Sequence, residues 1–230
     1  MKPEAIIFDV DGTIANSERW GHLPACNEAF KILSLPLEWD WPTFKELLSI
    51  PGNANRLRYE LTRMNEYSTT DINAFVDAFV PIKKELYITK YLKQVELRSG
   101  IKNFIEAIVA AGTRIAIVST SYESQIKELL SAKLPDLKAY FKPILGKESG
   151  VKTGEQGMLY EKCLAALELP AAQCLVIEDS GAGFAAAKKA GIPTVVFYND
   201  YTEHEDFAGA VLLESSVKKI NMDKLINGEY

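Results

Sequence analysis

The residues whose types and spacing point most directly to chemistry stand near the start of the chain. An apolar run at 5–8 (AIIF) is followed by Asp9, Asp11, Gly12 and Thr13. The short apolar run predicts a buried strand, and two carboxylates at its exit repel each other unless a cation neutralises them. Mg²⁺ prefers oxygen ligands. The pattern therefore favours a magnesium site over the alternative, a solvated Asp-Gly turn.

Two later segments offer groups that bind an anion. The run at 114–118 (RIAIV) predicts a second strand, and Ser119 and Thr120 follow it. Hydroxyl and main-chain N–H groups at a strand-to-helix turn bind phosphate oxygens, although these hydroxyls would equally cap the next helix. Lys152 lies in a Gly-containing segment at 150–154. It would add a positive charge to the site or remain a solvated surface side chain.

A second acid pair follows a third apolar run. Residues 175–177 predict a strand, and Glu178 and Asp179 come next, before a small turn at 180–183. Asp179 would also serve as a helix N-cap, but acids at two strand exits and hydroxyls at a third are hard to explain as three separate caps. In open α/β sheets, ligands bind beyond the carboxyl ends of the strands. The sequence therefore predicts a phosphoryl-transfer site with one cation and an aspartate nucleophile.

In this order, the motifs resemble those of the haloacid dehalogenase superfamily of phosphohydrolases. The matching residues are Asp9-Val10-Asp11-Gly12-Thr13, Ser119, Lys152 and Glu178-Asp179. The likeness covers essentially the whole chain and is greatest to the CbbY-type sugar-bisphosphate phosphatases, which dephosphorylate xylulose-1,5-bisphosphate. This finer likeness is carried by Glu18, His22 and the segments 25–30, 51–56 and 199–207.

The resemblance implies a role for each motif residue. Asp9 would be the nucleophile that forms an aspartyl phosphate, and Asp11 would protonate the leaving alcohol and then activate water. Ser119, Thr120 and Lys152 would hold the phosphoryl oxygens. Mg²⁺ would be the cofactor. Its expected ligands are Asp9, Asp11 through its main-chain carbonyl, Glu178 and Asp179.

The lysine motif departs from the family pattern. Family members usually have Lys-Pro-x-Pro ahead of the next helix, whereas this chain reads KTGE at 152–155, with Lys152 about two positions early relative to Tyr160. Lys147 is therefore kept as an alternative to Lys152.

The resemblance also implies a substrate loop at 51–56. The substrate-binding residues expected in this part of the chain are Glu18, Asn53, Asn55 and Arg56. Glu18 would hold sugar hydroxyls. Arg56 would bind a second phosphate bidentately, or else it is an ordinary solvated helix residue.

The resemblance implies a Mg²⁺-dependent sugar-phosphate phosphatase that acts on a ketose bisphosphate such as xylulose-1,5-bisphosphate. Three alternatives stay open. They are a phosphomutase of the β-phosphoglucomutase type, a phosphoglycolate-type phosphatase of small monophosphates, and a catalytically idle binding protein. The intact acids argue against the last of these.

The chain alternates strand and helix patterns, which predicts an α/β fold with a doubly wound, parallel, Rossmann-like sheet. Strands are expected at 5–8, 114–118, 143–145, 175–177, 194–197 and 210–213, and helices between them at 101–111, 124–132, 158–168 and 183–190. Residues 16–95 lack β-rich runs and show helical periodicity at 23–33, 41–49, 53–64 and 71–93. We therefore expect a helical cap domain at 16–95, inserted in a catalytic core formed by residues 1–15 and 96–230.

Composition sets further limits on function. The net charge of −5 and the pI near 5.3 argue against a nucleic-acid partner. Three cysteines without metal-ligand spacing fit a reducing compartment, and no apolar run approaches the roughly 20 residues of a membrane span. We expect a cytoplasmic protein, or a plastid stromal one if the chain is a processed form. It would act on a small sugar phosphate in carbohydrate metabolism, as a monomer, without nucleic-acid or membrane partners.

Overall fold

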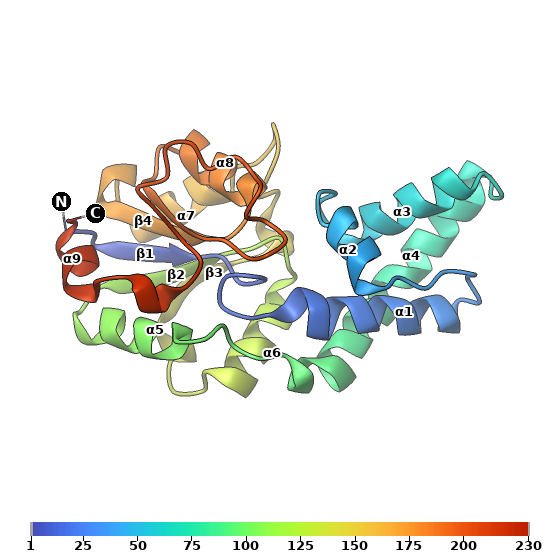
Figure 1. The fold of residues 1–230 in the computed structure, drawn as a ribbon, viewed down its shortest axis with the longest axis horizontal. Coiled ribbons are helices and arrows are strands. Elements are labelled where there is room, and N and C mark those ends of the chain that lie inside the picture. The colour runs from blue at the N-terminus through green and yellow to red at the C-terminus, as the bar shows by residue number, and fades with distance from the viewer. Residues whose placement is uncertain (1, 230) are drawn as a thin grey trace. The chain divides into compact units, whose positions relative to one another are not determined.

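The protein consists of two compact units in the computed structural model, which describes residues 2–229 (Figure 1). The sheet unit comprises Met1–Asn16 and Glu96–Tyr230, and the helical unit comprises Ser17–Val95. At the boundary, the main-chain N–H of Asn16 donates to the carbonyl of Glu96 at 2.8 Å. The chain therefore leaves the sheet unit and re-enters it at one point.

Parallel strands build the sheet unit. Over the described residues they form one sheet in the order β3-β2-β1-β4-β5-β6. The strands are β1 (Ala5–Phe8), β2 (Arg114–Val118), β3 (Phe141–Leu145), β4 (Cys174–Glu178), β5 (Thr194–Phe197) and β6 (Leu212–Glu214). Phe8 of β1 lies opposite Ile117 on one side and Ile177 on the other. Because β1, β2 and β4 are in register, the residues that follow them lie side by side. The predicted doubly wound parallel fold is confirmed.

Helices cover both faces of this sheet. They are α5 (Ile101–Ala110), α6 (Glu123–Lys133), α7 (Leu159–Leu167), α8 (Gly181–Lys189) and α9 (Met222–Asn227). Figure 1 shows α7 and α8 on one face and α5 and α6 on the other. Ile7 and Val176 share a buried cluster with Tyr160 of α7, whereas the ring of Phe8 meets that of Phe104 on α5 at 6.3 Å. A parallel sheet covered on both faces needs apolar residues at successive positions, which explains the unbroken apolar runs.

Several expected boundaries differ from the observed ones, among them those of the last strand and of the helix expected at 71–93. The last strand is Leu212–Glu214 rather than 210–213, because it is an edge strand whose extent follows its pairing with β5 and not an apolar run. The helix expected at 71–93 begins at Thr69, where Ser68 and Asp71 form a reciprocal capping box. It ends at Leu86, and the chain continues as a π-helical turn at Tyr87–Tyr91.

The helical unit has its own apolar core. Its helices are α1 (Leu23–Ile32), α2 (Trp41–Leu47), α3 (Asn53–Met64) and α4 (Thr69–Leu86). Phe30 stacks on Phe79 and meets Trp39 edge-on, and Leu57 of α3 is buried in the same cluster. This core, separate from that of the sheet, gives the helices rigid positions within their own unit.

No helix in the described part of the chain, residues 2–229, has both the length and the apolar character that crossing a membrane requires. The three cysteines are free and buried. Burial raises the pKa of the Cys26 and Cys163 thiols to about 12. Since the thiolate is the reactive form, these residues are packing groups rather than nucleophiles.

Candidate active site

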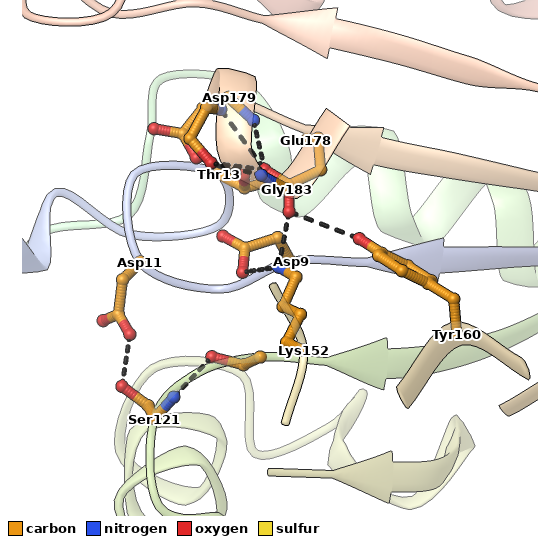
Figure 2. Close-up of polar contacts among 11 residues, drawn as sticks. Asp9, Asp11, Thr13, Ser121, Lys152, Tyr160, Glu178, Asp179 and Gly183 are labelled. Atoms are coloured by element: carbon orange, nitrogen blue, oxygen red, sulfur yellow. Dashed lines mark hydrogen bonds and ion pairs between the residues drawn. The ribbon is translucent and has the colours of Figure 1, made fainter. Parts of the chain in front are cut away.

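The first acid of the N-terminal motif lies directly beyond β1. The N–H of Asp9 donates to the carbonyl of Ile177 at 2.9 Å, so the exits of β1 and β4 are joined at this point. Asp9 is only 6% exposed. Its Oδ1 accepts a hydrogen bond of 2.6 Å from the Lys152 ammonium (Figure 2). A carboxylate is thereby held at the centre of the site with its other oxygen available for chemistry.

Lys152 reaches Asp9 because its loop folds back on itself. The N–H of Met158 donates to Val151 O at 2.9 Å, which closes the loop. Gly157 lies so close to the carbonyl of Lys152 that a Cβ at this position would overlap it. The loop therefore brings Lys152 into the site, where it is 4% exposed.

Lys147, the alternative lysine, lies elsewhere. It is exposed, and its Nζ lies over the ring of Tyr122, 5.0 Å from the centroid. The geometry brings Lys152, and not Lys147, to the acidic residues.

Glu178 is fully buried, and both of its oxygens are occupied. Its Oε1 accepts from the Lys152 ammonium and, at 3.3 Å, from the hydroxyl of Tyr160. Its Oε2 accepts from the N–H groups of Asp179 and Ser180 at 3.0 and 3.2 Å. Glu178 therefore orients Lys152 and shapes the turn after β4, in addition to contributing negative charge.

Asp179 is held through both carboxylate oxygens. Thr13 donates its hydroxyl to Oδ1 at 3.1 Å, and Asn199 donates its side-chain amide to Oδ2 at 2.8 Å. Thr13 comes from the β1 loop, whereas Asn199 follows β5. Segments from three strand exits thus meet at this one side chain.

The electrostatics of this cluster favour a cation. Burial raises the pKa of Asp9 to about 7, although Lys152 opposes the shift. Burial, together with Asp9 and Glu178, also raises the pKa of Asp179 well above its usual value. Burial acts to lower the pKa of Lys152, but Asp9 and Glu178 raise it well above the ordinary range. One ammonium therefore leaves the carboxylates incompletely neutralised.

The donor set fits a hard divalent ion. Asp9, Glu178 and Asp179 each present a carboxylate oxygen within 4.8 Å of the others. Carboxylate oxygens are the ligands that Mg²⁺ prefers. A divalent cation would relieve the repulsion that raises the pKa of Asp9 and Asp179. The residues present are therefore suited to hold Mg²⁺.

The carboxylate of Asp11 points away from this cluster. It accepts a hydrogen bond from the Ser121 hydroxyl, as Figure 2 shows. The Ser121 N–H in turn donates to Oγ of Ser119 at 3.1 Å. Ser119 is fully buried, whereas Thr120 is exposed. Of the four expected metal-binding residues, Asp9, Glu178 and Asp179 have side chains in the acidic cluster and Asp11 does not.

The remaining expected residues belong to the helical unit. The Arg56 Nε donates to the carbonyls of Leu47 and Ile50 at 3.0 and 2.9 Å, and Nη1 donates to Asn53 Oδ1 at 2.8 Å. Arg56 is 6% exposed and is therefore not a solvated helix residue.

Glu18 and Asn55 complete the expected set in the helical unit. Glu18 lies beside Arg56, with 3.6 Å between its Oε2 and the arginine Nη1. This buried oxygen has no hydrogen-bond partner among the described residues. Asn55 is exposed and bonds to the carbonyl of Pro51 at 2.8 Å.

Three polar residues at the site were not expected from the sequence. Ser121 continues the hydroxyl run that begins at Ser119, so the run itself was an available signal. Tyr160 and Asn199 do not belong to such a run of hydroxyl residues at the end of a predicted strand. Asn199 belongs to the segment 199–207, which carries part of the resemblance to the CbbY-type phosphatases.

The fold and the strand-exit residues agree with an independent family match. The pattern of the family described as haloacid dehalogenase-like hydrolase matches residues 6–197. The chain belongs to this family of hydrolases.

Within the family, the chain is similar to CbbY proteins. It is 35% identical over 214 residues to the plasmid CbbY protein of Cupriavidus necator, covering 91% of this chain and 84% of that protein. Two crystal structures of CbbY from Rhodobacter sphaeroides are 30% identical, with a TM-score of 0.75, and cover 94% of this chain and 95% of theirs. One is a complex with phosphate, and the other is a mutant in complex with xylulose-(1,5)bisphosphate. Family and relatives together assign the chain to the phosphatases.

Proposed function

We propose that the protein is a Mg²⁺-dependent phosphatase of a ketose bisphosphate and works through an aspartyl phosphate on Asp9. The observation that carries the chemistry is the buried cluster of Asp9, Lys152, Glu178 and Asp179. Its hydrogen bonds hold three carboxylates and one ammonium together, which supports Asp9 as the nucleophile and the carboxylates as the cation-binding groups. Pre-organised charge of this kind is the main source of catalysis in phosphoryl transfer.

Two residues perform the covalent chemistry. An oxygen of Asp9 attacks phosphorus, a bond forms between that oxygen and phosphorus, and the bond from phosphorus to the substrate oxygen breaks. Asp11 gives its proton to the departing alcohol. In the second half, Asp11 takes a proton from water as the water attacks the phosphorus, which releases inorganic phosphate and restores the Asp9 carboxylate.

The surrounding residues hold the reacting groups. Lys152 orients Asp9 and binds a phosphoryl oxygen, with Ser119 and the main chain of Thr120 as further phosphate donors. Asp9, Asp179 and the carbonyl of Asp11 would hold Mg²⁺, and Glu178 would add charge from the position fixed by Lys152. When bound, the ion neutralises charge between the nucleophile and the phosphate.

The substrate class rests on the helical unit and on the relatives. The buried Oε2 of Glu18 lies 3.6 Å from Nη1 of Arg56 but accepts no hydrogen bond from the described residues, so it suits a sugar hydroxyl as donor. Arg56 supplies a fixed guanidinium whose Nη2 has no hydrogen-bond partner among residues 2–229, and such groups bind phosphate well. Asn53 and Asn55 lie at the start of the same helix. A related CbbY was crystallised with xylulose-(1,5)bisphosphate, so we infer that this compound is the first substrate to test.

The proposal is tested by phosphate release from purified protein. The panel contains xylulose-1,5-bisphosphate, sugar monophosphates, phosphoglycolate and para-nitrophenyl phosphate, each with a Mg²⁺ titration and a chelator control. Acid quenching of a turnover with ³²P-labelled substrate should leave a base-labile label on Asp9.

We expect the highest kcat/KM with the ketose bisphosphate and no turnover in chelator. Preference for a monophosphate would contradict the substrate assignment. Conversion of β-glucose 1-phosphate without phosphate release, with a bisphosphate as activator, would identify a phosphomutase instead.

A further inference from the structure

Asn199 joins two segments that carry the acidic cluster. Its side-chain Nδ2 donates to Oδ2 of Asp179 at 2.8 Å and to the carbonyl of Gly12 at 3.0 Å. The carbonyl of Gly12 can only accept a hydrogen bond, so the amide must present its NH₂ group to this side. One side chain therefore connects the loop after β1 with the turn after β4.

The donor is held in place by its own turn. The N–H of Asn199 donates to the Thr202 hydroxyl at 2.9 Å, and its carbonyl accepts from the N–H groups of Thr202 and Glu203 at 3.1 and 2.9 Å. Thr202 is 3% exposed. This turn begins just after β5, and its hydrogen bonds fix the main chain of Asn199.

The two segments that Asn199 connects are also in direct contact. Gly12 has φ +89°, and a Cβ at this position would overlap Oδ2 of Asp179. The Gly12 carbonyl accepts a second hydrogen bond, of 2.8 Å, from Nη1 of Arg98. The distance between the β1 loop and Asp179 is therefore set by packing. Thr13 holds Oδ1 of the Asp179 carboxylate at 3.1 Å, and the Asn199 amide fixes Oδ2, the other oxygen.

From this geometry we infer that Asn199 is a positioning residue of the cation site, where it fixes the orientation in which Asp179 binds a divalent metal. The inference rests on the Mg²⁺ site proposed above and extends it to a residue outside the four sequence motifs. Hydrogen-bond partners of metal-binding side chains act in this way in other metal sites, and losing one typically weakens metal binding by about 10- to 100-fold.

The test measures metal binding without turnover. Mg²⁺ is titrated calorimetrically into metal-free wild-type protein and into Asn199→Leu, which keeps similar bulk and removes both donors. Asn199→Ala is measured in parallel and serves if the leucine variant does not fold. The matched control is Asn221→Leu, since Asn221 caps α9 through Lys224 N at 3.1 Å and lies outside the site. Thermal unfolding in chelator reports on structure separately.

We expect Mg²⁺ binding about 10- to 100-fold weaker in both Asn199 variants and unchanged in Asn221→Leu. The Mg²⁺ concentration for half-maximal activity should rise in parallel, while kcat at saturating Mg²⁺ recovers most of its value. Wild-type affinity in a folded Asn199 variant would overturn the inference and leave the proposed function intact. Equal weakening in Asn221→Leu would also overturn it. Absence of Mg²⁺ binding to the wild type would overturn the proposed function and this inference with it.

Discussion

At the scale of single residues, the site concentrates negative charge in a buried place. Asp9, Glu178 and Asp179 are 6%, 0% and 3% exposed. Lys152 donates to two of them and neutralises only part of their charge. Burying charges without full compensation is unfavourable. This cost falls on the residues that are proposed to bind Mg²⁺, so stability and the proposed function depend on the same residues.

The metal-free protein should therefore become more stable as the pH falls from about 8 to about 6. Burial raises the pKa of Asp9 to about 7 in the fold, above its ordinary value of 3.8. At a pH between these two pKa values, Asp9 is protonated in the folded state and ionised in the unfolded state. The free energy of unfolding therefore decreases as the pH rises toward the folded-state pKa of about 7. Thermal unfolding in chelator across this range measures the effect. Asp9→Asn should reduce the slope, and a melting temperature that rises with pH in this window would contradict the prediction.

Asp9→Asn should abolish turnover while the protein stays folded. A neutral amide is a far weaker nucleophile and metal ligand, and loss of a covalent nucleophile costs rates on the order of 10⁴-fold or more. Activity of purified protein, together with circular dichroism, checks both parts of this expectation. Retention of more than a small fraction of the wild-type rate would exclude the covalent mechanism.

Asp11→Asn should slow both chemical steps by about 10²- to 10⁴-fold, the usual effect of removing a general acid–base. Ser121→Ala is the graded comparison, because it keeps the carboxylate and removes only the hydroxyl that holds it. We expect a smaller loss in that variant. Steady-state rates of both variants at neutral pH measure these losses. A near-normal rate for Asp11→Asn would assign the proton transfer to another residue.

At the scale of elements, parallel strands in register bring the chemistry together. Phe8, Ile117 and Ile177 lie at matching positions of three neighbouring strands. The residues that follow them share one edge without any special local conformation. Lys152 is the exception, because a loop and not a strand places it.

The effect of that loop is tested by comparing two lysines. Lys152→Ala should depress kcat strongly, because it removes the ammonium that pairs with the Asp9 carboxylate at 2.6 Å. Lys147→Ala should be mild, since its ammonium contacts the ring of Tyr122. Phosphate release by the two variants at saturating Mg²⁺ measures the difference. The reverse order of activities would transfer the role to Lys147.

At the scale of the whole molecule, the two units supply different parts of the proposed reaction. The sheet unit carries the carboxylates, and the helical unit carries Arg56 and Glu18. The guanidinium of Arg56 bonds to Leu47 and Ile50 within its own unit and contacts the ring of Phe44. Arg56 therefore has a structural role in the helical unit in addition to the proposed binding role.

Arg56→Ala should raise KM for a bisphosphate far more than for para-nitrophenyl phosphate. Charge-assisted hydrogen bonds contribute roughly 1.5–3 kcal/mol, so a change of about tenfold or more is expected. Arg63→Ala is the control on the same helix, since the Arg63 side chain is 64% exposed and pairs with Glu60. Both variants are measured on both substrates, with thermal unfolding to register the structural role. Equal losses on the two substrates would assign Arg56 to structure alone.

Much of this protein follows from local sequence patterns. Continuous apolar runs predict strands buried on both faces, and the acids and hydroxyls after them predict a shared site at one sheet edge. Asp9, Glu178 and Asp179 lie together as those patterns indicate. Such inferences succeed because strand formation depends on neighbours in the chain, and parallel pairing then aligns the strand ends.

Other features were decided only by the tertiary structure. The choice between Lys152 and Lys147 depended on how a loop folds back, and the occupancy of both Glu178 oxygens depended on Tyr160 and the following turn. Asn199 meets Gly12 across 187 positions of the chain. No local periodicity encodes such contacts, because they exist only after the sheet has brought distant segments within hydrogen-bond distance. The sequence thus indicated which groups are proposed to do the chemistry, whereas the folded chain determined which residues hold those groups in place.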